Sequence, residues 1–107
     1  MPLLEREEPF RDAIMLNVAI VGLGRWGQNL VNAVQGKSAH IRFVCAVVRN
    51  PEPLRDYAAK NKIELTTDFA AALADPHIKA IVLATPHSLH AEQIIAVAAA
   101  GKPVYCE

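Results

Sequence analysis

The sequence contains no hydrophobic run that approaches the roughly 20 residues of a membrane-spanning helix, so we expect a soluble protein. It also lacks an excess of either charge, because 11 basic residues balance 11 acidic residues. A neutral chain has no general electrostatic attraction to nucleic acid or to an anionic membrane, and neither partner is predicted. The first residues are acidic and have no long apolar core, which is unlike a secretory signal, so the cytoplasm is the expected compartment.

Cysteine is scarce, with two residues in 107, and both lie in apolar stretches that are typical of strands. If the strand order is 3-2-1-4-5, the strands of Cys45 and Cys106 lie three spacings of about 4.8 Å apart. A disulfide requires Cα atoms within about 7 Å, so we expect two reduced thiols. His87 and His90 have a spacing that could present two metal ligands, but only Glu92 lies nearby to extend the set, and no metal site is predicted.

The most informative stretch is V-A-I-V-G-L-G-R-W-G, residues 18–27, which places G-x-G-x-x-G between a strand-like run and a helix-like run. Gly22 would make the tight turn, Gly24 would let the backbone approach a pyrophosphate, and Gly27 would let the helix pack closely on the sheet. Unpaired N–H groups and the dipole at the helix start would hold the diphosphate. The alternative is a glycine-rich strand–helix turn that binds no ligand.

Strand-like and helix-like segments alternate from residue 16 onward. The strands are expected at 16–21, 42–48, 64–66, 80–84 and from 104. The helices are expected at 25–35, at 51–61 after an Asn50 cap, from Thr67 or Asp68 to 74, and at 89–100 after a Ser88 cap. This alternation predicts an α/β fold, a doubly wound parallel sheet of the Rossmann type. Residues 1–15 show no clean period and are expected to form an N-terminal arm or extension, with the dinucleotide-binding domain at 16–107.

Ligands of such sheets bind outside the carboxyl ends of the strands. An acidic residue about 20 positions after the glycines would hold the ribose of NAD, but Arg49 and Asn50 lie there instead. An arginine can neutralise a 2′-phosphate and stack on adenine, which favours NADP, while Asn50 keeps NAD as the alternative. His90 is expected either to offer a neutral imidazole to the ligand or simply to pack in its helix. Trp26 is expected to pack beside the phosphate loop, with stacking on a base as the alternative.

Three separated stretches together resemble the N-terminal domain of the glucose-fructose oxidoreductase, inositol dehydrogenase and MocA (Gfo/Idh/MocA) family. They read V-A-I-V-G-L-G-R-W-G, A-I-V-L-A-T-P-H-S-L-H-A-E and A-A-G-K-P-V-Y-C-E, and they cover about residues 16–107 in the family's order. The resemblance implies an NAD(P)-dependent oxidoreductase that transfers a hydride between nicotinamide and a sugar, a cyclitol or a related hydroxyl compound. In that family a substrate domain, which often forms the oligomer interface, follows the Rossmann domain, so a homo-oligomer is expected.

The resemblance also implies which residues would contact the dinucleotide. Those candidates are Gly22, Leu23, Gly24, Arg25, Trp26, Gly27, Arg49, Asn50, Thr85, Pro86, His90 and Glu107. The family's fifth strand ends in Glu-Lys-Pro, so its catalytic lysine would follow Glu107, and no catalytic residue is assigned within the 107 residues. We therefore expect the first domain of the enzyme, truncated at strand five, without its substrate domain and not catalytic alone. The alternative is a stand-alone NAD(P)-binding sensor or interaction module without turnover; a methyltransferase is disfavoured by the second and third stretches.

Overall fold

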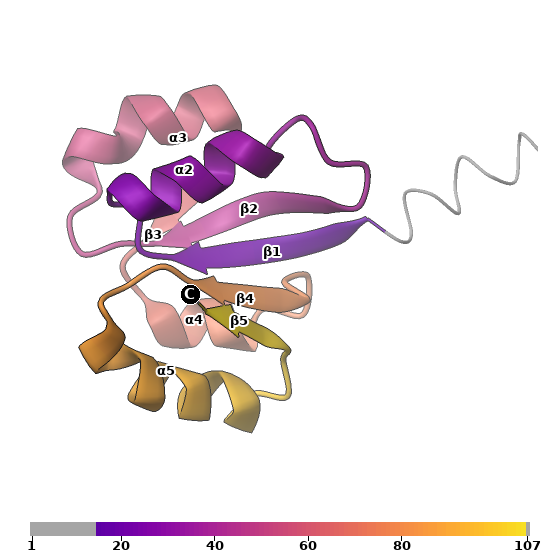
Figure 1. Cartoon of the computed structure of the whole chain (residues 1–107), viewed down its shortest axis with the longest axis vertical. Helices are drawn as coiled ribbons and strands as arrows, with labels where there is room; N and C mark the ends of the chain where they lie inside the picture. The colour runs from indigo at the N-terminus through magenta and orange to yellow at the C-terminus, as the bar shows by residue number, and fades with distance from the viewer. Residues whose placement is uncertain (1–14, 107) are drawn as a thin grey trace, which may run out of the picture.

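The computed structural model describes residues 15–106, and all of the predicted N-terminal arm except Met15 lies outside that range. Five parallel strands form one sheet in the order β3-β2-β1-β4-β5, the order that the sequence predicts (Figure 1). The strands are β1 (Leu16–Val21), β2 (Ile41–Val47), β3 (Glu64–Thr66), β4 (Ala80–Leu83) and β5 (Val104–Cys106). The sheet is built outward from β1 in both directions, so β1 and β4 flank the point where the strand order reverses.

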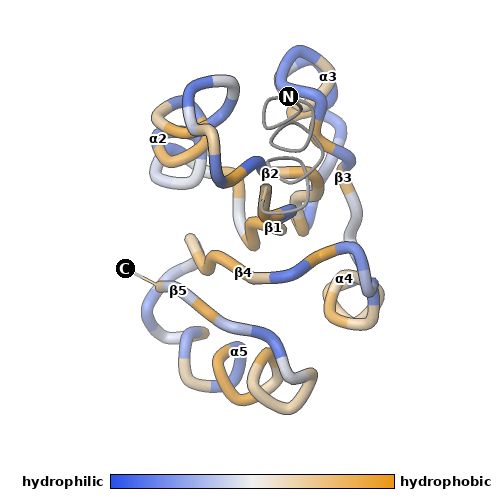
Figure 2. Tube along the Cα trace, turned by 90° about the vertical axis from the view of Figure 1, so that its right-hand side faces the viewer, coloured by the Kyte–Doolittle hydropathy of each residue, from blue (hydrophilic) through white to orange (hydrophobic). Residues whose placement is uncertain are grey.

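Helices cover both faces of this sheet, which is why the central strands are apolar throughout. One face carries α2 (Arg25–Val34), the short 3₁₀ helix η1 (Glu52–Leu54) and α3 (Arg55–Asn61), and the other carries α4 (Phe69–Ala74) and α5 (His87–Ala99). Figure 2 shows the two helical layers on opposite sides of the strands. The expectation of a doubly wound α/β fold of the Rossmann type is confirmed.

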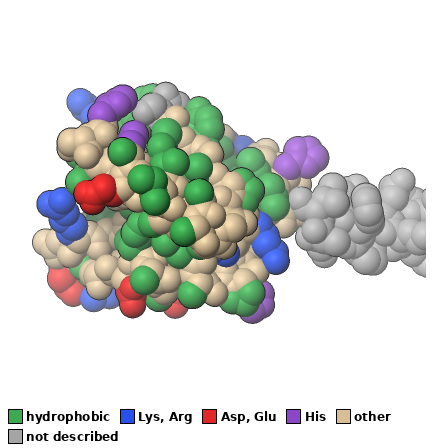
Figure 3. Space-filling model, turned by 90° about the horizontal axis from the view of Figure 1, so that it is seen from below, with side chains coloured by type: hydrophobic (Ala, Val, Ile, Leu, Met, Phe, Trp, Pro, Cys, Tyr) green, Lys and Arg blue, Asp and Glu red, His purple; other side chains and the backbone are tan. Residues whose placement is uncertain are grey.

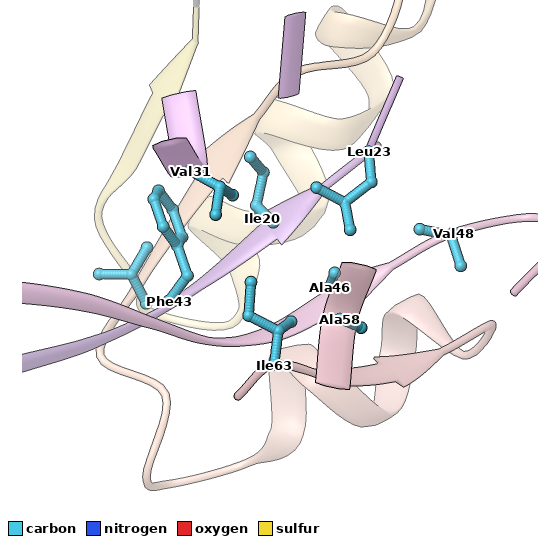
Figure 4. Packing of buried hydrophobic residues seen from close by; sticks show 9 residues of the cluster. Ile20, Leu23, Val31, Phe43, Ala46, Val48, Ala58 and Ile63 are labelled. Atoms are coloured by element: carbon cyan, nitrogen blue, oxygen red, sulfur yellow. The ribbon is translucent and has the colours of Figure 1, made fainter. Parts of the chain in front are cut away.

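Successive side chains of a strand point to opposite faces, and β1 divides its side chains between two cores. Val18 and Ile20 pack in the cluster under α2 and α3, whereas Ala19 and Val21 pack in the cluster under α4 and α5. Figure 4 shows the first cluster, in which Val31 of α2 lies over the sheet. Burying a large aliphatic side chain contributes roughly 1.5–3 kcal/mol, so β1 stabilises both layers at once and holds the segment that follows it in place.

The observed element boundaries match several predicted ones. Strands β1 and β3 have the expected bounds, and β2 begins and ends one residue earlier than expected. Helix α2 ends at Val34, one residue earlier than predicted, and Gly36 beyond it has φ +76°. Asp68 caps α4 as predicted, since its side chain accepts a hydrogen bond from the backbone N–H of Ala71.

Two predicted helix starts were wrong, and a proline lies at each of them. The segment after Asn50 begins as the 3₁₀ helix η1, and Pro51, whose backbone is already helical, takes the N-cap position in place of Asn50. Helix α5 begins at His87, two residues before the predicted start, because Pro86 with an extended backbone precedes it directly. Ser88 therefore lies inside the helix and does not cap it.

Cys45 and Cys106 are both free thiols, as expected, and they lie on strands separated by β1 and β4. Burial, with a smaller contribution from the negative charges of Glu64 and Asp75, raises the pKa of the Cys45 thiol from 9.0 to about 11. The thiol is thus neutral at physiological pH. No helix within residues 15–106 has the length and apolar character needed to cross a lipid bilayer.

The face of the molecule formed by α5 carries exposed hydrophobic side chains (Figure 3). Figure 3, which looks at the molecule from the side of α5, shows hydrophobic side chains gathered over the middle of this face and charged groups toward its margin. Ile95 of α5 is 69% exposed and Tyr105 of β5 is 56% exposed.

Candidate functional site

The site begins at the turn that follows β1. Gly22 has φ +98°, in the left-handed region that favours glycine. A Cβ atom on Gly22 would lie 3.0 Å from the carbonyl oxygen of Ala84 and 3.1 Å from Cγ2 of Thr85. The turn after β1 therefore packs directly against the segment that follows β4, and only a residue without a side chain fits there.

The other two glycines of the motif lie in opposite environments. Gly27 is buried, and a Cβ atom on it would overlap the carbonyl oxygen of Gly22. This absence of a side chain lets α2 approach the end of β1. A Cβ atom on Gly24, in contrast, would meet no atom within 4 Å. Gly24 is exposed at the N-cap of α2, where unpaired backbone N–H groups face outward.

A cavity of about 600 Å³ opens over this turn, outside the carboxyl ends of β1, β2 and β4. Its lining is formed by Val21, Gly22, Leu23, Gly24, Val47, Val48, Arg49, Asn50, Leu54, Thr67, Phe69, Ala84, Thr85, Pro86, Leu89 and Gln93. Among these described residues Arg49 alone carries a charge, and it forms no ion pair with any residue of 15–106. The cavity is therefore locally cationic on its β2 side in a chain whose net charge is +0.

Helix α5 holds the opposite wall of the cavity at Thr85. The hydroxyl of Thr85 donates a hydrogen bond of 2.5 Å to Oε1 of Gln93. A second hydrogen bond of 2.7 Å joins Nε2 of His90 to the carbonyl oxygen of Thr85, with the imidazole nitrogen as donor. His90 is 8% exposed, and it packs inside the protein while it orients the wall.

The structure brings together most of the residues that the sequence nominates. Gly22, Leu23, Gly24, Arg49, Asn50, Thr85 and Pro86 all line the one cavity. The Leu23 side chain is buried in the core, so Leu23 faces the cavity through its backbone. Gly27 and His90 support the cavity walls from behind, and Arg25 and Trp26 lie on the exposed start of α2, outside the lining. Glu107 lies outside the described residues.

Nine lining residues are not among the candidates nominated from the sequence, namely Val21, Val47, Val48, Leu54, Thr67, Phe69, Ala84, Leu89 and Gln93. Gln93 could have been found, because it follows His90 by three residues and so lies one helical turn further along α5. Four of the others lie at or directly after the ends of β1, β2 and β4, whereas Leu54 of η1 and Phe69 of α4 reach the cavity through helix packing. The rings of His87 and His90 lie 5.1 Å apart, and residues 15–106 hold no cluster of three or more His, Cys, Asp or Glu side chains able to bind a metal ion.

A parallel sheet whose first strand runs through a glycine turn into a helix, with a cavity at the strand-order reversal, defines a dinucleotide-binding domain of the Rossmann class. The family model described as "Oxidoreductase family, NAD-binding Rossmann fold" (Gfo/Idh/MocA) matches residues 16–107. The chain belongs to this oxidoreductase family.

Curated relatives include dehydrogenases of sugars and cyclitols. The chain is 31% identical over 96 residues to an inositol 2-dehydrogenase of Streptomyces avermitilis, covering 87% of this chain and 27% of that protein. It is 36% identical over 101 residues to a levoglucosan dehydrogenase of Pseudarthrobacter phenanthrenivorans, covering 86% and 26% of the two chains. The chain thus spans about a quarter of the length of these relatives.

A solved structure of the same fold contains a bound dinucleotide. The scyllo-inositol dehydrogenase of Lactobacillus casei, determined with NAD(H) and scyllo-inositol, has a TM-score of 0.78 and 27% sequence identity, and the match covers 86% of this chain and 27% of that one.

Proposed function

We propose that this chain is the dinucleotide-binding part of an oxidoreductase that transfers a hydride between nicotinamide and a hydroxyl group of a sugar, a cyclitol or a related compound. The observation that carries the proposal is the environment of Gly24. This residue has no side chain and open space around it, lies at the N-cap of α2 and lines a cavity of about 600 Å³. When bound, the nicotinamide ring would supply the hydride acceptor or donor.

The residues of the cavity fit a dinucleotide. The diphosphate would lie over Gly22–Gly24, where the N–H groups and the dipole of α2 favour an anion. Arg49 and Asn50, at the end of β2, would contact the adenosine ribose. Thr85 and Pro86 would form the wall beside the nicotinamide half, with His90 holding Thr85 in place. Arg25 and Trp26, which directly follow Gly24, and Glu107 remain proposed contacts of the ligand.

We infer further that NADP binds more tightly than NAD. Arg49 is exposed, lines the cavity and forms no ion pair with a described residue, so its guanidinium is available for a 2′-phosphate. No acidic side chain lies among the described lining residues to hold both ribose hydroxyls. The alternative, NAD held through Asn50, would not depend on the charge of Arg49.

The test is calorimetric titration of the chain with NADP and with NAD, repeated on Arg49→Gln. A charge-assisted hydrogen bond contributes about 1.5–3 kcal/mol, so we expect NADP to bind about 10- to 100-fold more weakly to the variant and NAD to change little. Arg55→Gln is the matched control, because Arg55 is an exposed arginine that pairs with Glu52 and is not among the described lining residues. Tighter binding of NAD than of NADP by the wild type would overturn the NADP preference, and binding of neither would overturn the proposed function.

A further inference from the structure

Thr85 is held at two points by α5, and the proposed function uses only one of them, the hydrogen bond from His90. We propose that Gln93 is a positioning residue of the nucleotide site, which fixes the side-chain rotamer of Thr85 and thereby the distance between the glycine turn and the opposite wall of the cavity. The inference rests on the proposed function, and the role that it assigns to Gln93 is exerted through Thr85.

The two hydrogen bonds have different tasks. The bond from His90 to the carbonyl oxygen of Thr85 fixes the backbone of the segment after β4. That bond leaves the side-chain torsion of Thr85 free. The bond from the hydroxyl of Thr85 to Oε1 of Gln93 removes this remaining freedom. Because His90 and Gln93 lie one turn apart on α5, a single rigid helix determines both the backbone and the side chain of Thr85.

The rotamer of Thr85 matters because its methyl group packs on the glycine turn. Cγ2 of Thr85 lies 3.1 Å from the position that a Cβ atom of Gly22 would occupy. With the hydroxyl directed to Gln93, the methyl group faces Gly22 and fills the space that the glycine leaves. Another rotamer would turn the methyl group away from this contact and direct a different group at the turn or into the cavity. The width of the cavity at the diphosphate position therefore depends on the acceptor that Gln93 provides.

Gln93 is well placed to act in this way without contributing to the core. Its side chain is half-buried and lines the cavity, and it belongs to neither hydrophobic cluster. Replacement by Met keeps an unbranched side chain of similar length with good helix propensity and removes the carboxamide with its acceptor oxygen. Replacement by Glu retains an acceptor oxygen for the Thr85 hydroxyl.

The first test measures the Thr85 rotamer directly in the free protein, by three-bond NMR couplings to Cγ2. We expect a single rotamer in the wild type and in Gln93→Glu, and rotamer averaging in Gln93→Met. Glu92→Ala, an exposed neighbour on α5 outside the cavity lining, is the matched control and should leave the couplings unchanged. An unchanged single rotamer in Gln93→Met would overturn the inference, because a merely structural glutamine would alter stability without releasing this torsion.

The second test measures NADP and NAD affinity in a double-mutant cycle of Gln93→Met and Thr85→Val. The loss of one hydrogen bond corresponds to about 3- to 10-fold weaker binding by Gln93→Met in the wild-type background. In the Thr85→Val background, where the hydroxyl is absent, Gln93→Met should have no further effect. Additive effects would show that Gln93 acts independently of Thr85 and would contradict the inference.

The two proposals fail in distinguishable ways. A wild-type chain that binds neither dinucleotide removes the proposed function and this inference with it. A wild-type chain that binds a dinucleotide, together with a Gln93→Met variant of equal affinity, removes this inference alone and leaves the proposed function intact.

Discussion

Gly24 and Gly27 lie three residues apart at the start of α2, and alanine at each position is expected to have opposite consequences. A methyl group on Gly27 would overlap the carbonyl oxygen of Gly22, a backbone atom that cannot rotate away. Overpacking of this kind costs typically 1–3 kcal/mol, and we expect the upper end because α2 must move off the sheet. In a domain of this size each kcal/mol lowers Tm by at least about 4 °C, so Gly27→Ala should melt about 10 °C or more below the wild type.

A methyl group on Gly24 meets no atom within 4 Å, and the residue has φ −75° and ψ −164°, an extended backbone that alanine adopts freely. We expect the unfolding free energy of Gly24→Ala to stay within about 0.5 kcal/mol of the wild type. The same methyl group would project toward the space proposed for the diphosphate. Loss of one charge-assisted hydrogen bond to backbone N–H weakens binding by about 10- to 100-fold.

Thermal melting and calorimetric titration of the two variants together separate folding from binding. Gly36→Ala is a useful control, because Gly36 also has open space around it but φ +76°, and it lies at the far end of α2. It should lose some stability from strain and none of its dinucleotide affinity at temperatures where it is folded. The reasoning is refuted if Gly24→Ala binds the dinucleotide as tightly as the wild type, or if Gly27→Ala melts at the same temperature.

Three further outcomes are expected. The free energy of unfolding, measured in urea, should fall by about 2 kcal/mol as pH rises from 9 to 11. The Cys45 thiol, with its pKa raised to about 11 in the folded state, ionises at lower pH in the unfolded chain, and in Cys45→Ala this part of the fall should disappear. Asp68→Ala removes the acceptor at the start of α4 and should cost about 1 kcal/mol, whereas an unchanged Tm would contradict the capping role. Ile95→Ser should leave Tm nearly unchanged and shift sedimentation toward the monomer; a wild type that sediments as a monomer at all concentrations would refute the expected homo-oligomer.

The centre of the sheet could be predicted from the sequence because its strands are buried on both sides. The sequences of β1 and β4 are short apolar runs with turn residues at their ends. Because strand-like and helix-like segments alternate along the chain, a parallel sheet is the simplest arrangement that connects them. The position of the cavity followed from the same pattern, since the glycine turn, Arg49 and Thr85 all come directly after parallel strands. Local sequence and topology were sufficient for these features.

Two kinds of feature could not be predicted from the sequence: helix starts at which a capping side chain competes with a neighbouring proline, and contacts that arise from the packing of distant elements. Asn50 and Ser88 both have side chains suited to capping, but the neighbouring prolines fix the backbone and decide where each helix begins. Phe69 reaches the cavity because α4 packs at the sheet edge, a contact that no local pattern specifies. The bond between Gln93 and Thr85 depends on the rotation of α5 relative to the end of β4, which only the folded structure defines.

The most direct test of the account is a calorimetric titration of the wild-type chain with NADP and NAD beside the Gly24→Ala variant. We expect saturable binding of one dinucleotide per chain by the wild type, with NADP the tighter ligand, and binding at least about 10-fold weaker in a variant that melts at the wild-type temperature. A wild type that takes up neither dinucleotide, or a variant that binds as well as the wild type, would contradict the assignment of the glycine turn as the phosphate site.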